Sequence, residues 1–156
     1  MSATGRIVVL GIGNLLKGDD GVGVRVIEAL EARNLPPEVE LVDGGAGGLT
    51  LLVHFEGARA LVIVDAVNLG APPGTVRAFG LGDIEDAGLP VRFSLHEVGI
   101  LPMLELARQL GQLPGEVRII GVQPERFDLG DQLSEAVAAA VPEAVEVVMQ
   151  ELARLA

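Results

Sequence analysis

Carboxylates and a histidine are the side chains of this sequence whose types and spacing could do chemistry. Two adjacent acids, Asp19 and Asp20, lie in the glycine-rich segment 11–23. A third acid, Asp65, directly follows four apolar residues, and His96 lies where a long loop gives way to a helical pattern. Two carboxylates and an imidazole would suit a borderline divalent metal such as zinc, nickel or cadmium. The absence of cysteine excludes disulfides, thiolate ligands and a Cys nucleophile.

The glycine-rich segment lies between an apolar run and an amphipathic pattern, as a turn between a strand and a helix would. Ligands of open α/β sheets bind beyond the carboxyl ends of the strands, so chemistry is expected here. A dinucleotide-binding fingerprint would need its third glycine where this sequence has Leu16. Phosphates would also be repelled by Asp19 and Asp20. The segment therefore favours metal ligands or acid–base groups, with helix capping by one of the two acids as the alternative.

Each candidate residue also has a purely structural interpretation. Asp65, at the boundary of the hydrophobic core, could cap a helix or pair with an arginine. A lone histidine such as His96 is more often structural than catalytic. Asp43, which precedes Gly44 and Gly45, could simply form a turn. His54 falls near the end of a helical pattern and is interpreted as a residue with no chemical role.

Length and composition predict a single domain covering residues 1–156. With 49% hydrophobic residues, the chain can bury a substantial core. No apolar run is long enough to span a membrane, and the N-terminus lacks a signal-peptide pattern, so we expect a cytoplasmic protein. The formal net charge of −11 disfavours nucleic acid as a partner and favours a basic peptide or a cation.

Strands and helices alternate along the first half of the chain. Apolar runs predict strands at residues 6–12, 39–42 and 61–64. Helical patterns begin at Val22 and Leu49 and end before Pro36 and Gly57. This alternation implies right-handed crossovers and a three-layer α/β/α architecture. If the first strand lies between the other two, Asp20 and Asp65 lie at neighbouring carboxyl ends, at a topological switch point.

The second half departs from this alternation. Residues 75–79 alternate weakly, as an edge strand would, and residues 80–92 predict a loop. The segment Ser94-Leu95-His96-Glu97 matches a capping box, which places His96 in the first turn of a helix. Pro102 implies that a helix either starts near it or kinks there.

The end of the chain predicts one more strand and one long helix. The strand covers residues 116–122, and Pro142 would kink or restart the helix. The buried face of that helix is expected to hold Val137, Val141, Val145, Val148 and Leu152.

Gly11 to Gly23 resembles the opening motif of the hydrogenase maturation endopeptidases. The family's later landmarks are matched in order by Asp43-Gly44-Gly45, Asp65-Ala66, Ser94-Leu95-His96-Glu97 and Gly121-Val122-Gln123-Pro124. The resemblance runs from about residue 6 to the C-terminus. It implies a phosphorylase/hydrolase-like fold with a mostly parallel, mixed five-stranded sheet whose single antiparallel strand would be the weak edge strand.

The resemblance implies an endopeptidase, aspartic-type by family classification. Its partner would be the large-subunit precursor of a nickel–iron hydrogenase, and it would remove the C-terminal extension after nickel insertion. Nickel would be supplied by the substrate, and zinc or cadmium could occupy the same site. By position, Asp20, Asp65 and His96 are the implied metal-contacting and catalytic residues, although some members have Glu in place of Asp20. Asp43, with Gly44 and Gly45, is similar to a position that helps to recognise the substrate.

Two mechanisms and two other functions stay open at this point. The metal would polarise the scissile carbonyl or activate water, or an aspartate would act as general base. The chain has neither a Ser–His–Asp pattern nor a His-Glu-x-x-His helix. A nickel-binding chaperone would keep the same three ligands and cleave nothing. A Rossmann-type nucleotide-binding domain would use Asp43 as its ribose-binding acid.

Overall fold

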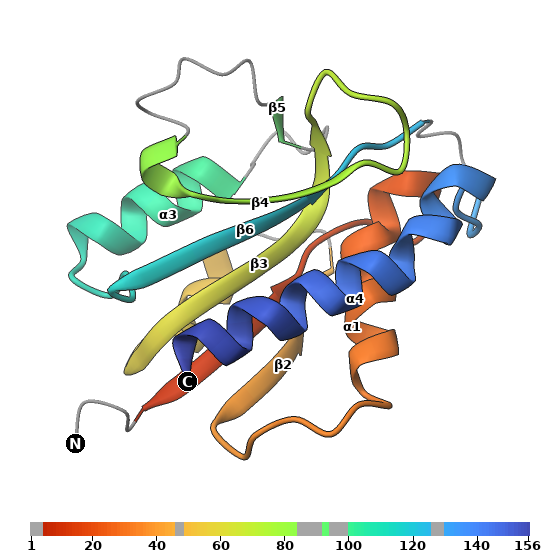
Figure 1. Ribbon diagram of the computed structural model, residues 1–156. Coiled ribbons are helices and arrows are strands. Elements are labelled where there is room, and N and C mark those ends of the chain that lie inside the picture. Colours follow the sequence, from red (N-terminus) through yellow and green to blue (C-terminus); the bar gives the residue numbers. More distant parts are fainter. Residues whose placement is uncertain (1–4, 46–48, 84–91, 94–99, 126–129) are drawn as a thin grey trace.

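The structure is a computed structural model that describes residues 5–45, 49–83, 92–93, 100–125 and 130–156. A central sheet lies between helices on both faces (Figure 1). This arrangement confirms the expected α/β architecture.

Five strands form the main sheet, in the order β2-β1-β3-β6-β4. Their bounds are β1 (Arg6–Gly11), β2 (Val39–Asp43), β3 (Ala58–Asn68), β4 (Val76–Gly80) and β6 (Glu116–Val122). The first three and β6 run parallel, and β4 pairs antiparallel with β6 at one edge. The short β5 (Arg92–Phe93) pairs antiparallel with the end of β3, outside this order. The mixed, mostly parallel sheet was predicted correctly.

Helices α1 (Val22–Leu30) and α4 (Glu135–Leu155) cover one face of the sheet (Figure 1). Alternate residues of β1 and β3 point into this core, among them Val9, Val62 and Val64. Because both faces of β1 and β3 are buried, these strands are apolar at almost every position.

The 3₁₀ helix η2 (Leu49–His54) and helix α3 (Ile100–Gln109) cover the other face. Phe55, Met103 and Leu104 pack there against Val8 and Leu10 of β1. They also pack against the residues of β3 that alternate with Val62 and Val64. None of the described helices is both long and apolar enough to cross a membrane.

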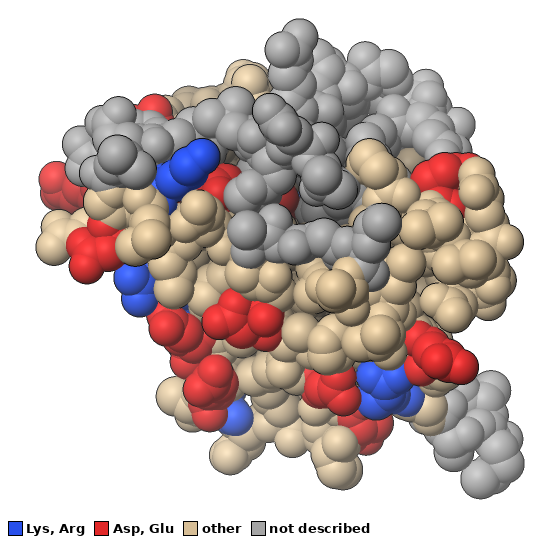
Figure 2. Space-filling view, turned by 180° about the vertical axis from the view of Figure 1, so that it is seen from behind, with Lys and Arg blue, Asp and Glu red and all other residues tan. Residues whose placement is uncertain are grey.

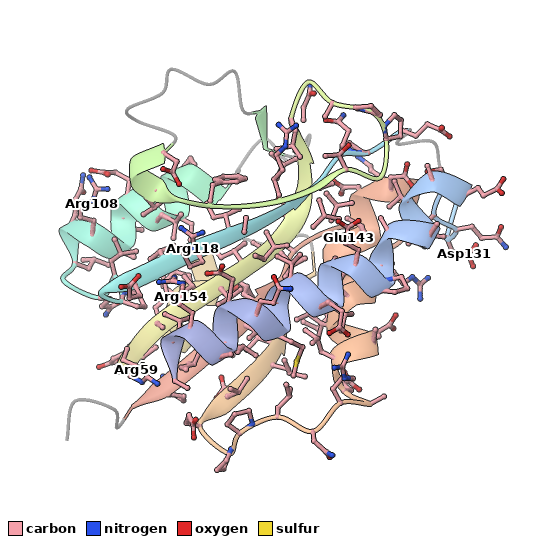
Figure 3. The ribbon with its side chains drawn as sticks, in the orientation of Figure 1. Arg59, Arg108, Arg118, Asp131, Glu143 and Arg154 are labelled. Atoms are coloured by element: carbon pink, nitrogen blue, oxygen red, sulfur yellow. The ribbon has the colours of Figure 1, made fainter. Side chains whose placement is uncertain are left out.

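The surface is rich in acids, as the net charge of −11 requires. On the face seen from behind, acidic side chains outnumber basic ones among the coloured residues (Figure 2). Near the C-terminal end of α4, Glu151 accepts hydrogen bonds from Arg118 of β6 at 2.8 Å and from Arg154 at 3.1 Å. Both arginines are labelled in Figure 3. This group ties α4 to β6.

Two expected elements differ from the structure. The helix predicted from Leu49 onward is the six-residue 3₁₀ helix η2, a type that commonly serves as a connector. Strand β3 does not end before Asp65 but continues to Asn68. The extension is stabilised because Ala66 pairs with Val122 of β6 and Val67 pairs with Phe93 of β5.

The two prolines inside helical patterns are tolerated in different ways. Pro102 lies in the first turn of α3, so the helix starts near it. This is the first of the two predicted alternatives, a start near Pro102 or a kink there. Pro142 lies inside α4, which continues through it without a restart. In the predicted loop, Gly80 belongs to β4 and residues 81–83 are helical. Residues 84–91 of the predicted loop lie outside the described residues, whereas its last residue, Arg92, belongs to β5. The predicted capping box at 94–97 also lies outside the described residues.

Candidate active site

The candidate site lies at the carboxyl ends of β1 and β3. The two strands are neighbours, with Gly11 opposite Val64, and the N–H of Ile12 donates to the carbonyl of Val64 at 3.0 Å. The crossover from β1 to β2 runs through α1 on one face, and the crossover from β2 to β3 runs through η2 on the other. The predicted strand order 2-1-3 and its topological switch point are therefore confirmed.

Glycines in the turn after β1 allow backbone to pack against backbone. Gly13 has φ of 153°, and a Cβ there would overlap the carbonyl oxygen of Asp20. A Cβ at Gly23 would overlap the carbonyl oxygens of Val64 and Ile12. The glycine spacing thus serves the close approach of η1 (Gly18–Gly21) and α1 to the strand ends. Packing of backbone against backbone accounts for these glycines without a bound nucleotide.

Asp20 is buried in η1, with 1% of its surface exposed. Its Oδ2 accepts a hydrogen bond from the N–H of Asn14 at 3.0 Å, and its own N–H donates to the carbonyl of Lys17 at 3.1 Å. The η1 turn packs against β3, the strand that carries Asp65. Asp20 is therefore held against the end of the sheet.

Asp65 is fully buried inside β3. Its neighbours Val64 and Ala66 belong to the core beneath α1 and α4, whereas Ile63 and Val67 belong to the core beneath η2 and α3. Strand alternation places Asp65 on the second of these faces. Its Oδ1 accepts a hydrogen bond from the N–H of Ala66 at 2.8 Å, which fixes the orientation of the carboxylate.

His96, the third predicted ligand, lies outside the described residues. Helix α3, which begins soon after it at Ile100, packs Met103 against the same core as Ile63 and Val67. The described residues alone contain no group of three His, Cys, Asp or Glu side chains that could hold a metal ion. The structure packs η1, which carries Asp20, against β3, which carries Asp65, and a site that includes His96 stays a prediction.

Asp43 lies exposed at the end of β2, on the edge of the sheet. Its Oδ1 accepts a hydrogen bond from the N–H of Gly45 at 2.9 Å, which is the turn-forming role given above as an alternative. Gly44 donates to the carbonyl of Gly11 at 2.8 Å, and Gly45 accepts from Gly13 at 2.6 Å. This segment braces the turn that carries Asp20.

The sequence did not reveal that Asp19 and Asp20 have different partners. Asp19 Oδ1 accepts from the N–H of Ser134 at 2.6 Å, and Oδ2 accepts from Ser134 Oγ and from the N–H of Glu125, both at 2.8 Å. The N-cap of α1 is Gly21, which makes no side-chain hydrogen bond, so neither acid caps that helix in the expected way. The partner of Asp19 is Ser134, which is the N-cap of α4. A serine directly before the terminal helical pattern is a typical N-cap, and this was the only local signal for that residue in the sequence.

His54 lies at the opposite end of the sheet. Its Nδ1 is 3.6 Å from Glu40 Oε1, and its carbonyl accepts a hydrogen bond from Arg6, the first residue of β1. His54 therefore lies far along β1 from the glycine turn, and its lack of a chemical role stays a prediction.

Comparison with known proteins places these features in a family. The family model described as hydrogenase maturation protease matches residues 24–151. The chain is 45% identical over 147 residues to the hydrogenase expression/formation protein HoxM of Cupriavidus necator, covering 90% of this chain and 70% of that protein. It is 36% identical over 153 residues to the hydrogenase 2 maturation protease of Escherichia coli, covering 94% and 90% of the two chains.

Solved structures agree with the sequence relatives. The hydrogenase maturating endopeptidase HybD from E. coli superposes with a TM-score of 0.84 at 35% identity, over 96% of this chain and 93% of that one. A hydrogenase 2 maturation peptidase from Thaumarchaeota archaeon SCGC_AB-539-E09 gives a TM-score of 0.72 at 38% identity, over 94% and 97%. Fold and sequence both point to the class of α/β peptidases that act in hydrogenase maturation. The chain belongs to the hydrogenase maturation protease family.

Proposed function

We propose that this protein is an endopeptidase that removes the C-terminal extension of the large-subunit precursor of a nickel–iron hydrogenase after nickel insertion. Family membership supports an endopeptidase of hydrogenase maturation. The observation that carries the site is the placement of two buried carboxylates, Asp20 and Asp65, on adjoining elements at the carboxyl ends of neighbouring strands. Nickel bound to the precursor is part of what these carboxylates recognise.

Asp20 and Asp65 are presented as oriented carboxylates. One oxygen of each accepts a backbone hydrogen bond, from Asn14 at 3.0 Å and from the adjacent Ala66 at 2.8 Å. His96 completes the proposed set, which combines carboxylate and imidazole ligands suited to a borderline divalent ion. Three protein ligands leave coordination positions open for the precursor's own groups, and zinc or cadmium would fit the same set.

Peptide hydrolysis at this site needs an activated water and a polarised carbonyl. The substrate's nickel would act as a Lewis acid on the scissile carbonyl or on the water. Alternatively, Asp20 or Asp65 would take the proton from water as a general base, which would make the enzyme aspartic in type. Asp43, exposed at the end of β2 and joined through Gly45 to the turn that carries Asp20, is proposed to contact the precursor.

The decisive experiment compares precursor with and without nickel. We expect the parent protein to cleave the nickel-loaded form and to leave the metal-free form intact. Asp20→Asn, Asp65→Asn and His96→Ala should each abolish cleavage while the protein stays folded. Glu143→Gln is the matched control, because Glu143 is an exposed acid on α4 (Figure 3). This variant should cleave the precursor like the parent. Efficient cleavage of metal-free precursor, or near-normal activity of His96→Ala, would contradict the shared-metal mechanism.

The same experiment separates a peptidase from a nickel-binding chaperone. A chaperone with these three ligands would bind nickel-loaded precursor and release it at full length. Mass spectrometry of the precursor after incubation therefore distinguishes the two functions, and family membership favours the peptidase.

A further inference from the structure

Asp19 is a buried acid that the proposed chemistry does not use. It has 0% exposure and is the neighbour of Asp20 in η1, yet its hydrogen bonds run to other parts of the chain. Both of its carboxylate oxygens accept hydrogen bonds from protein donors, one from Ser134 N–H and the other from Ser134 Oγ and Glu125 N–H. A carboxylate suits this place because it can accept all these bonds and donates none.

These donors come from segments far away in the sequence. Ser134 is the N-cap of α4, and Glu125 lies just beyond the end of β6. Ser134 Oγ donates to Asp19 and also accepts the N–H of Val137 at 3.4 Å, so a single hydroxyl both caps α4 and binds the turn. Asp19 therefore joins the turn after β1 to the last helix and to the last strand.

The backbone supports the same connection. Gly18 N–H donates to the carbonyl of Gly130, and Gly130 N–H donates to the carbonyl of Leu16, both at 2.9 Å. The segment that follows, which contains Asp131, leads into the N-terminal end of α4 (Figure 3). The η1 turn is thus fixed to this segment both by backbone bonds and by the Asp19 side chain.

We propose that Asp19 is a positioning residue for the cleavage reaction, because it clamps η1 to the N-terminus of α4 and so fixes the orientation of the Asp20 carboxylate. This proposal rests on the proposed function of Asp20. Within one turn, Asp19 binds Ser134 and Glu125, whereas Asp20 accepts from Asn14. Loosening the first set of bonds would let η1 rotate or shift, and Asp20 would leave its place beside Asn14.

Asp19→Asn is the sharpest variant, because it keeps the size of the side chain. The amide has one accepting oxygen, so its NH₂ group must face at least one backbone N–H, of Ser134 or of Glu125. On nickel-loaded precursor we expect kcat to fall about 10- to 100-fold, as for groups that orient metal ligands, with KM within a few-fold of the parent.

A stability control separates positioning from a general loss of structure. Val148→Ala removes fully buried side-chain volume from α4, away from the turn. It should lower the thermal unfolding midpoint at least as much as Asp19→Asn and leave kcat close to that of the parent. Ser134→Ala removes one donor but keeps the carboxylate, so it should lower kcat less than Asp19→Asn. It also serves as the second variant if Asp19→Asn does not fold.

Equal losses of kcat in Val148→Ala and Asp19→Asn, or parent-like kcat in a folded Asp19→Asn or Ser134→Ala protein, would overturn the proposal. A second readout does not depend on cleavage. The NMR amide signal of Asn14, whose N–H donates to Asp20, should move in Asp19→Asn and stay in place in Val148→Ala. If the parent cuts no precursor, the proposed function fails, and this signal alone decides on Asp19. An unmoved signal would then refute the positioning role.

Discussion

The Cα of Gly13 faces the carbonyl oxygen of Asp20 so closely that no side chain fits between them. Gly13→Ala would place a methyl group on that oxygen and would strain a residue whose φ is 153°. We expect the free energy of unfolding to fall by about 3 kcal/mol, as for severe overpacking, and precursor cleavage to be lost. Urea denaturation measures the first effect. Gly115→Ala is the control, because a Cβ there has no atom within 4 Å. A Gly13→Ala protein as stable as that control would contradict the backbone packing described for the turn.

Lys17 is the only lysine of the chain, and its backbone matters more than its side chain. Its N–H donates to the carbonyl of Asn14 and its carbonyl accepts from Asp20, both at 3.1 Å, and alanine keeps both bonds. The side chain is exposed. Lys17→Ala should therefore process nickel-loaded precursor within a few-fold of the parent rate. Complete loss of cleavage by a folded variant would show that the lysine side chain takes part in the reaction.

Metal removal should leave the protein folded. Asp20, Asp65 and His96 come from three separate segments, and the cores on both faces of the sheet are apolar. The fold therefore does not depend on a metal in the way that small metal-stabilised domains do. A chelator should leave the thermal unfolding midpoint unchanged, and calorimetry should show only weak binding of nickel or zinc to the protein alone. A large fall of the midpoint in chelator would instead indicate a resident structural metal.

Asp43 has two roles that a pair of substitutions can separate. Asp43→Asn keeps a side-chain oxygen for the N–H of Gly45 and removes the charge, whereas Asp43→Ala removes both. If the charge recognises the precursor, Asn should raise KM several-fold at unchanged stability. Ala should raise KM similarly and also lower stability by about 1 kcal/mol through the lost hydrogen bond. A parent-like KM for Asp43→Asn would leave Asp43 with its turn-forming role alone.

Local patterns in the sequence predicted much of the sheet. Strand β6 has the predicted bounds, β1 and β2 differ from theirs by one residue, and helix α1 begins at the predicted Val22. Short continuous apolar runs are typical of strands that are buried on both faces, and the spacing of buried residues in α1 is typical of an amphipathic helix.

The errors fall where distant partners decide the structure. Strand β3 is longer than its apolar run because β5 and β6 pair with its end, across a gap in sequence that no local pattern reveals. Likewise, the partner of Asp19 is Ser134, which lies 115 residues away. The pair of adjacent acids indicated a site, but only the tertiary structure shows that one acid binds the scaffold and the other lies against β3.

The bond between Asp19 and Ser134 also has a consequence for protein synthesis. A ribosome makes the glycine turn early and the start of α4 late, so a nascent chain carries Asp20 well before Ser134 has been translated. Until α4 leaves the ribosome, the turn lacks the donors of Ser134 for Asp19. Competence to cut a precursor should therefore require that α4 has been translated and has docked against the glycine turn.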